Sequence, residues 1–309
     1  MKASLERHNG RIKIRINDEL IDPVSFRSFR PQEKIVKSFG SHGFRLMSVF
    51  PSGINSTLKV PYSQFGEVWI GDEKYNFDNL KKQVDLFVKS APQAYLSLMV
   101  QLDTRDWFLK ENPQCADTFD NIVITAGFEK WRKSAARFMC DLFDFVDENY
   151  PEKVFAIFLF CGRTCEWYTP ADDGSYHPLK EKAFKVWCSD SAKTLPTYEE
   201  LHNTTLGVFR HPVEDRAALE YWHFHNKIIA ETIGYFARIA KQHTDNTRLV
   251  GVFAGYLMHG MPLSSGTWLF REIVNNNDID ILFSPASYTF RKLDSTSAFM
   301  LPVDSISLH

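Results

Sequence analysis

Apolar residues fall into short, nearly unbroken blocks along the chain. Blocks of this kind, rich in Val, Ile, Leu and Phe and bounded by Pro, Gly or Asp, are typical of strands that are buried on both faces of a sheet. Six blocks predict strands: 24–29, 44–50, 94–102, 154–160, 249–257 and 279–283.

Between these blocks, apolar residues recur every three or four positions, which is the spacing of an amphipathic helix. Pro31 opens one such segment, and Asn76 precedes another in the position of a helix cap. Helices are predicted over 31–40, from 77 onwards, and over 128–149, 179–189, 215–242 and 268–274.

Strands that alternate with helices predict an α/β protein with a parallel sheet and helices outside it. A (β/α)8 TIM-type barrel fits this order best, with about six strands visible in the chain. Residues 11–16 alternate basic residues with Ile, and Asn17-Asp18 makes a turn, which predicts a hairpin. We therefore divide the chain into an N-terminal extension and hairpin, 1–21, and a barrel domain, 22–309, whose last strands are missing.

Chemistry in such barrels lies where strands end, because the loops that follow the strands meet at one face. Glu166 ends the fourth predicted strand and is followed by Trp167 and Tyr168. Aromatic neighbours desolvate a carboxyl, which raises its pKa and lets it serve as a general acid. The residue pattern also allows the alternative that Glu166 forms a structural ion pair with Arg163.

Other polar and aromatic residues at predicted strand ends suit a sugar, which presents apolar C–H edges and polar hydroxyls. For most of them, packing or a structural ion pair is an equal alternative. The candidates for substrate binding are Arg27, Asp103, Trp107, Trp167, Tyr256, His259 and Tyr288.

The charge and cysteine content of the chain exclude several classes of binding partner. The chain of 309 residues has 36 Lys and Arg against 38 Asp and Glu, spread without charged blocks, so nucleic acid is not expected as a partner. Its five cysteines lack zinc-type spacing, and no glycine-rich phosphate loop opens a helix, so neither a metal nor another cofactor is expected. The absence of a signal peptide or a long apolar run predicts a soluble protein without membrane association and favours the cytoplasm.

Several segments resemble the catalytic barrel of family 42 glycoside hydrolases, the β-galactosidase-like group of clan A. Phe65-Gly66-Glu67 and residues 75–80 are similar to the segment that leads into that family's second helix. Residues 182–188 and 195–203 resemble the helix and turn after the acid strand, and 279–288 resembles the sixth strand.

The resemblance implies a retaining glycosidase acting on a carbohydrate substrate, with Glu166 as acid/base. It also places Tyr288 where the family's Tyr touches the nucleophile. The nucleophilic Glu of the clan ends strand seven, has no matching position here, and is expected beyond His309. Cys165 departs from the family, in which Asn precedes the acid and contacts the sugar 2-hydroxyl.

A second hypothesis follows from these departures. Cys165 and the missing nucleophile favour a noncatalytic carbohydrate-binding or scaffold barrel, or an inactive fragment of such an enzyme. A homo-oligomer is compatible with either hypothesis, and the sequence does not choose the sugar.

Overall fold

The computed structural model describes residues 1–169, 174–253, 263–266, 268 and 270–283, and its centre is a six-stranded sheet. All neighbouring strands of this sheet are parallel, in the order β11-β10-β9-β8-β5-β4. The strands are β4 (Ser25–Arg27), β5 (Leu46–Val49), β8 (Tyr95–Gln101), β9 (Val154–Phe160), β10 (Leu249–Phe253) and β11 (Ile281–Phe283).

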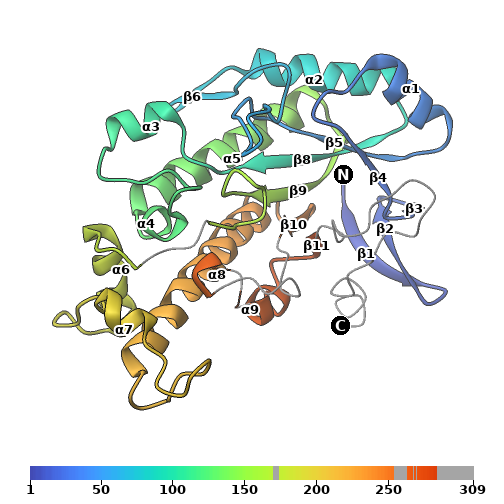
Figure 1. Ribbon diagram of the computed structural model, residues 1–309. Coiled ribbons are helices and arrows are strands. Elements are labelled where there is room, and N and C mark those ends of the chain that lie inside the picture. Colours follow the sequence, from blue (N-terminus) through green and yellow to red (C-terminus); the bar gives the residue numbers. More distant parts are fainter. Residues whose placement is uncertain (170–173, 254–262, 267, 269, 284–309) are drawn as a thin grey trace.

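Because spatial order follows sequence order and helices connect the strands, the sheet is a curled half-barrel of the predicted (β/α)8 type (Figure 1). The helices between its strands are α1 (Glu33–Ser41), α2 (Phe77–Ser90), α3 (Asp106–Glu111), α4 (Ile122–Ala126), α5 (Glu129–Asn149), α6 (Pro178–Cys188), α7 (Tyr198–His202), α8 (Arg216–His243) and α9 (Phe270–Val274). A short 3-10 turn, η2, covers Leu263–Ser265.

Sequence periodicity located the long helices but not α3 and α4. These two helices have six and five residues, too few for an apolar stripe to repeat. The local signal for α4 is Asn121, whose side chain accepts a hydrogen bond from the Ile124 backbone N–H and caps the helix.

The larger hydrophobic core lies between the sheet and the helices. Helix α5 contributes Trp131 and Phe138, and α8 contributes Phe236, all fully buried. The Trp131 indole N–H also donates to the Leu102 carbonyl, 3.0 Å away, at the end of β8. This core therefore fixes the strand ends relative to the helices behind them.

A second core fills the other side of the sheet, where an antiparallel sheet from the N-terminus packs against it (Figure 1). This sheet comprises β1 (Ala3–His8), β2 (Arg11–Ile16) and β3 (Glu19–Ile21); β1 was not predicted. Ile14 and Ile16 pack in one cluster with Phe158 of β9. The Ala3 N–H donates to the Thr247 carbonyl just before β10, 2.8 Å away, so the N-terminal sheet covers the end of the barrel where strands begin.

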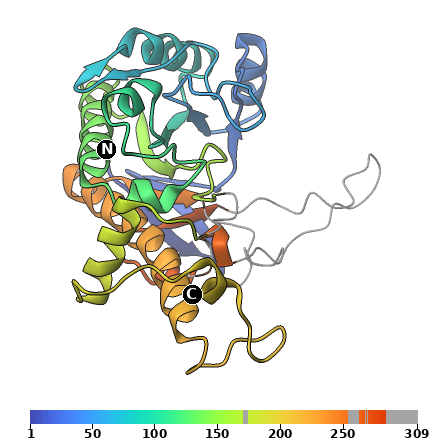
Figure 2. The same cartoon turned by 60° about the vertical axis from the view of Figure 1, so that its left-hand side comes forward.

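The segment between β9 and α8 protrudes from the body and carries α6 and α7 (Figure 2). Its end is held by the buried Asp215 carboxylate, whose Oδ2 accepts hydrogen bonds from the backbone N–H groups of Thr205 and His211. Between β5 and α2, a small antiparallel ribbon is formed by β6 (Trp69–Gly71) and β7 (Lys74–Tyr75).

Candidate active site

Asp103 joins two loops at the carboxyl end of the sheet. It lies two residues beyond β8 and is fully buried. Its Oδ1 accepts hydrogen bonds from the Thr118 hydroxyl and from the Arg163 backbone N–H, each 2.7 Å long. Oδ2 has no hydrogen-bond partner among the described residues. Asp103 therefore ties the loop after β9 to the loop after β8 and keeps one oxygen unused.

The loop after β9, residues 161–168, is here called the acid loop. Its backbone takes left-handed conformations at Gly162, Arg163, Cys165 and Trp167. Non-glycine residues adopt this region at a cost, which persists only where surrounding contacts hold them. The holding contacts include the Trp167 N–H, which donates to the Cys161 carbonyl 3.1 Å away, and the Asp103 bond to Arg163.

Trp167 anchors the acid loop to the hydrophobic core. Its side chain is 2% exposed and belongs to the large core, and its indole N–H donates to the Leu159 carbonyl of β9 at 3.0 Å. The predicted sugar contact of Trp167 has no exposed ring face in this position. We therefore assign Trp167 a packing role and leave it out of the site.

Glu166 is held at the end of β9 by this anchor and is 7% exposed. Its backbone N–H lies 3.4 Å from the Thr164 hydroxyl. The predicted alternative, an ion pair with Arg163, is not what the structure contains, because the Arg163 guanidinium is paired with Asp117. The desolvated position expected for a general acid is thus present at Glu166.

Tyr62 is a site residue that strand ends did not reveal, because it lies in the loop after β5. Its hydroxyl donates to the Arg163 carbonyl at 2.5 Å. Burial raises the pKa of Tyr62 above its usual range, and the charges of Cys165, Asp103 and Glu166 raise that pKa further. Tyr62 therefore remains a neutral hydrogen-bond donor that holds the backbone of the acid loop.

Cys165 occupies the position where the family resemblance implied Asn. It is buried, and burial raises the pKa of its thiol to about 12, although Tyr62, Arg27 and Gln101 lower that pKa. The thiol is therefore neutral near pH 7. Sulfur is a poor hydrogen-bonding group, so this position offers a sugar hydroxyl far less than an amide would.

The remaining predicted residues separate into three groups. Arg27, at the end of β4, is exposed and its guanidinium lies 5.9 Å from the Phe253 ring centroid, so it stays in the proposed site. Trp107, in α3, is half-buried and lines a cavity described below. Tyr256, His259 and Tyr288 lie outside the described residues.

A cavity of about 370 Å³ opens at the carboxyl end of the sheet. It is lined by residues from the loops after β5, β8 and β9, among them Glu67, Arg105 and Arg163. Because Arg163 belongs to the acid loop, the cavity adjoins the segment that carries Glu166.

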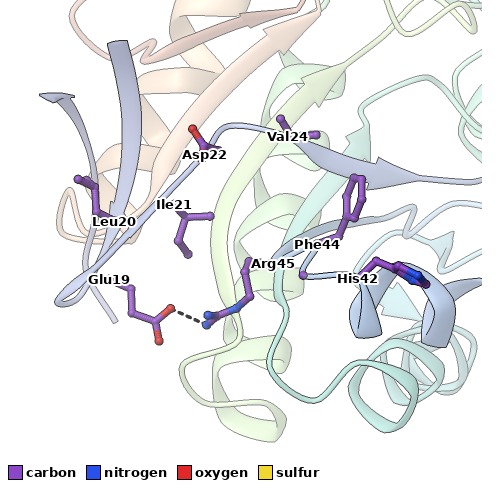
Figure 3. Close-up of a pocket in the computed structure, with 9 residues that line it drawn as sticks. Glu19, Leu20, Ile21, Asp22, Val24, His42, Phe44 and Arg45 are labelled. Atoms are coloured by element: carbon purple, nitrogen blue, oxygen red, sulfur yellow. Dashed lines mark hydrogen bonds and ion pairs between the residues drawn. The ribbon is translucent and has the colours of Figure 1, made fainter. Parts of the chain in front are cut away.

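A larger cavity, about 640 Å³, lies at the opposite end, where β4 and β5 begin. Figure 3 shows Glu19 of β3 facing Arg45 across it, and these side chains form an ion pair at 2.5 Å. Strand beginnings in (β/α)8 barrels serve stability, whereas strand ends carry the chemistry. We therefore place the candidate active site at the carboxyl end.

Within the described part of the chain, no three His, Cys, Asp or Glu side chains gather as metal ligands would. In the same residues, no helix combines the length and the apolar character needed to cross a membrane.

Asp103 gives a testable pH effect. Burial raises the pKa of its carboxyl above the ordinary 3.8, although the bonds from Thr118 and Arg163 oppose this. A raised folded-state pKa means that the folded chain holds the proton longer than the unfolded chain, so stability falls as pH rises from about 4 through the folded pKa.

Asp103→Asn cannot ionise. We expect the free energy of unfolding of Asp103→Asn, relative to wild type, to improve between pH 4 and pH 8 in urea titrations. Asp106→Asn, at an exposed position in the same segment, controls for the loss of a charge. A constant or worsening difference across this range would contradict the assignment.

No protein-family model matches the sequence, and a search of curated protein sequences found no significant match. Solved structures are similar, however. The catalytic domain of β-amylase from Paenibacillus polymyxa aligns with 91% of this chain and 81% of its own, at 11% identity and a TM-score of 0.58.

Two β-galactosidases also align. One is from the psychrophilic Marinomonas ef1, at 10% identity over 86% of this chain, and one is a family 42 enzyme from G. stearothermophilus, at 8% over 87%; both have a TM-score of 0.50. The aligned region spans 40% and 41% of the galactosidase chains. The predicted resemblance is therefore confirmed at the level of the fold alone: the chain is similar in fold to the catalytic domain of that β-amylase and to these β-galactosidases.

Proposed function

We propose that the protein is a glycoside hydrolase in which Glu166 is the general acid/base. The observation that carries this proposal is the position of Glu166 beyond the end of a central strand, shielded from water, in a loop that Asp103 holds through the Arg163 N–H, in a fold shared with glycosidases. In barrels of this type the residues at strand ends perform the chemistry.

In the proposed reaction, Glu166 protonates the glycosidic oxygen while a second carboxylate bonds to the anomeric carbon and the bond to the leaving group breaks. Water then attacks the anomeric carbon and displaces that carboxylate, and Glu166 accepts the proton of the water. Proton transfer of this kind contributes about 10²- to 10⁴-fold to a rate.

Arg27 and Asp103 are proposed to orient the sugar. Arg27 is exposed at the mouth of the sheet and offers several N–H donors to hydroxyls. The Asp103 Oδ2 atom has an unused acceptor position, but it is covered in this conformation. Its main role in the proposal is to fix the acid loop through the Arg163 N–H.

Retention and a β-galactoside substrate are the finer proposals, and they rest on the resemblance to family 42. A retaining enzyme needs a second carboxylate about 5 Å from the first across the scissile bond. We propose that it lies outside the residues described. Proton NMR of a p-nitrophenyl β-D-galactopyranoside digest tests this, because a retaining enzyme releases β-galactose first and an inverting enzyme releases α-galactose.

The main test is an assay of the purified chain with alkyl β-D-galactopyranosides and alkyl α-D-glucopyranosides, whose leaving groups are poor, compared with Glu166→Gln. Hydrolysis that disappears in the variant supports the proposal. Hydrolysis that is equal in both proteins refutes the role of Glu166.

A noncatalytic carbohydrate-binding barrel is the second candidate. It is favoured by Cys165, which offers a neutral thiol beside Glu166, and by Asp103, whose full burial makes it unsuited to attack a sugar. Saccharide binding without any hydrolysis, in wild type as in Glu166→Gln, would identify this alternative.

A further inference from the structure

Exposed apolar side chains are concentrated in the segment between β9 and α8, which extends away from the barrel (Figure 2). Fifteen large apolar side chains are exposed in the part of the chain that the structure describes. Seven of them lie in residues 174–215, about a sixth of that part. Single exposed apolar residues are common, whereas a group of them marks an interaction surface.

Four of the seven belong to one short loop, residues 205–213, which is here called the apolar loop. They are Leu206, Val208, Phe209 and Val213, with exposed fractions of 54%, 87%, 70% and 73%. The apolar loop is therefore the centre of this surface.

A buried carboxylate closes the apolar loop at its base. Asp215 Oδ2 accepts hydrogen bonds from the Thr205 backbone N–H at 3.1 Å, the Thr205 hydroxyl at 2.8 Å and the His211 N–H at 2.6 Å. The Asp215 N–H also donates to the His211 carbonyl at 3.0 Å. One side chain, 4% exposed, thus fixes both ends of the loop.

The turn within the apolar loop is a two-residue hairpin turn. Leu206 and Phe209 exchange both backbone hydrogen bonds, at 3.2 and 3.3 Å, and Gly207 takes a φ of +70° at the first central position. Glycine is the residue that such turns favour at this position. Because the loop is already ordered, it loses little conformational entropy when a partner covers it.

The apolar area of the loop can be compared with that of an ordinary protein interface. At the exposures given above, its four side chains present on the order of 300 Å² of apolar surface. A standard interface buries about 800 Å² per partner, of which a little over half is apolar. The apolar loop therefore supplies most of the apolar area that a stable dimer needs.

The charges around the apolar loop select among possible partners. Residues 199–216 contain four acidic and two basic side chains. An anionic membrane or nucleic acid attracts a basic surface, which these residues do not form. The net charge of the whole chain is only −2 at pH 7, so two copies repel each other weakly. A second copy of the chain is therefore a better match than a polyanion.

We propose that the apolar loop pairs with the same loop of a second copy of this chain about a two-fold axis. In a two-fold interface both copies offer the same patch, so an apolar loop without strong charge complements itself. This interaction surface goes beyond the proposed function and does not depend on the role of Glu166.

The test is sedimentation equilibrium of the full chain between about 1 and about 100 μM, a range that covers dimers of ordinary affinity. We expect the average mass of wild type to rise with concentration toward that of two chains. A mass of one chain across the whole range overturns the inference.

Val208→Asp is the main variant and Phe209→Asp the second. Both positions are exposed, so the core stays intact. A two-fold interface contains each substitution twice and brings like charges together, so the dissociation constant should rise about tenfold or more. Leu58→Asp, 82% exposed in the loop after β5, is the matched control and should dimerise like wild type. Circular dichroism checks that all three variants are folded.

A mixture of Val208→Asp and Val208→Lys tests whether the loop pairs with itself. Each variant alone places like charges in the interface, whereas the mixed pair places opposite charges there, so the mixture should associate more tightly than either variant. A mixture as weak as the separate variants contradicts pairing of the loop with itself.

Association that folded Val208→Asp and Phe209→Asp both retain overturns the inference, because the copies then meet at another surface. Vesicles of phosphatidylcholine test the remaining occupant of an apolar loop. A wild type that stays monomeric but co-sediments with these vesicles, in contrast to Phe209→Asp, would show that the loop contacts lipid and would refute the dimer.

Discussion

Glu166→Gln is expected to reduce kcat/KM for glycosides with poor leaving groups by about 10²- to 10⁴-fold, the contribution of a positioned general acid. Glutamine has nearly the shape of the acid but cannot donate the proton. Glycosides with p-nitrophenol as leaving group need little protonation, so their bond cleavage should be affected less. Steady-state kinetics on alkyl and aryl glycosides of one sugar measure the difference.

Glu214→Gln is a suitable control for this experiment, because Glu214 is exposed in the protruding segment. It makes the same chemical change far from the acid loop. Equal losses for alkyl and aryl substrates in Glu166→Gln would mean that Glu166 is not the proton donor. A loss in Glu214→Gln of similar size would point to a general defect.

Gly162→Ala is expected to lower kcat/KM by about 100-fold, because it displaces the acid loop. A displacement of a catalytic group by about 1 Å lowers the rate by about this factor. Gly162 has a φ of +81°, and a Cβ there would lie 2.4 Å from the Tyr168 carbonyl oxygen. Backbone at both ends of the loop must move to relieve this contact, and Glu166 lies between them.

Gly207→Ala separates the steric effect from the cost of the backbone conformation. Gly207 has a similar φ of +70°, but nothing lies within 4 Å of the position of its Cβ. Both variants incur the cost of an L-residue in the left-handed region, about 1–2 kcal/mol. Thermal unfolding should reveal that shared cost, whereas the loss in kcat/KM should belong to Gly162→Ala alone. Unchanged kinetics in Gly162→Ala would remove the acid loop from the mechanism.

The sequence predicted the sheet because strands that are buried on both faces consist almost entirely of apolar residues. Val154–Phe160 is apolar throughout, and the structure places its strand at those same residues, buried on both faces. Long helices such as α5 and α8 were predicted for a similar reason, since an apolar stripe repeats over many turns. Glu166 followed from the same logic, because it is the first carboxyl after a buried strand.

The sequence could not place side chains that reach the site from outside the strand ends. Tyr62 lies in an irregular loop, where no periodic signal exists, and only the folded chain brings its hydroxyl to the Arg163 carbonyl. The sequence also could not identify the carboxylate that pairs with the Arg163 guanidinium. Asp117 lies 46 positions away in the chain, and no local rule connects the two.

Trp167 shows the same limit for a residue that the sequence placed in the site and the structure places in the core. An aromatic residue beside a candidate acid suggests a sugar platform, and the sequence alone supports that hypothesis. The direction of its side chain, however, depends on left-handed backbone conformations on either side of Glu166, at Cys165 and Trp167. Those conformations are held by tertiary contacts, and they turn the indole into the core.

The sequence by itself therefore determined the alternation of strands and helices and the approximate position of each strand, since both depend on neighbours in the chain. Only the tertiary structure decided that Asp103 fixes the acid loop, that Arg163 pairs with Asp117 and that Trp107 lines a cavity at the carboxyl end of the sheet. These arrangements join residues distant in sequence, and hydrogen bonds and ion pairs between them form only when the fold brings their atoms within about 3 Å.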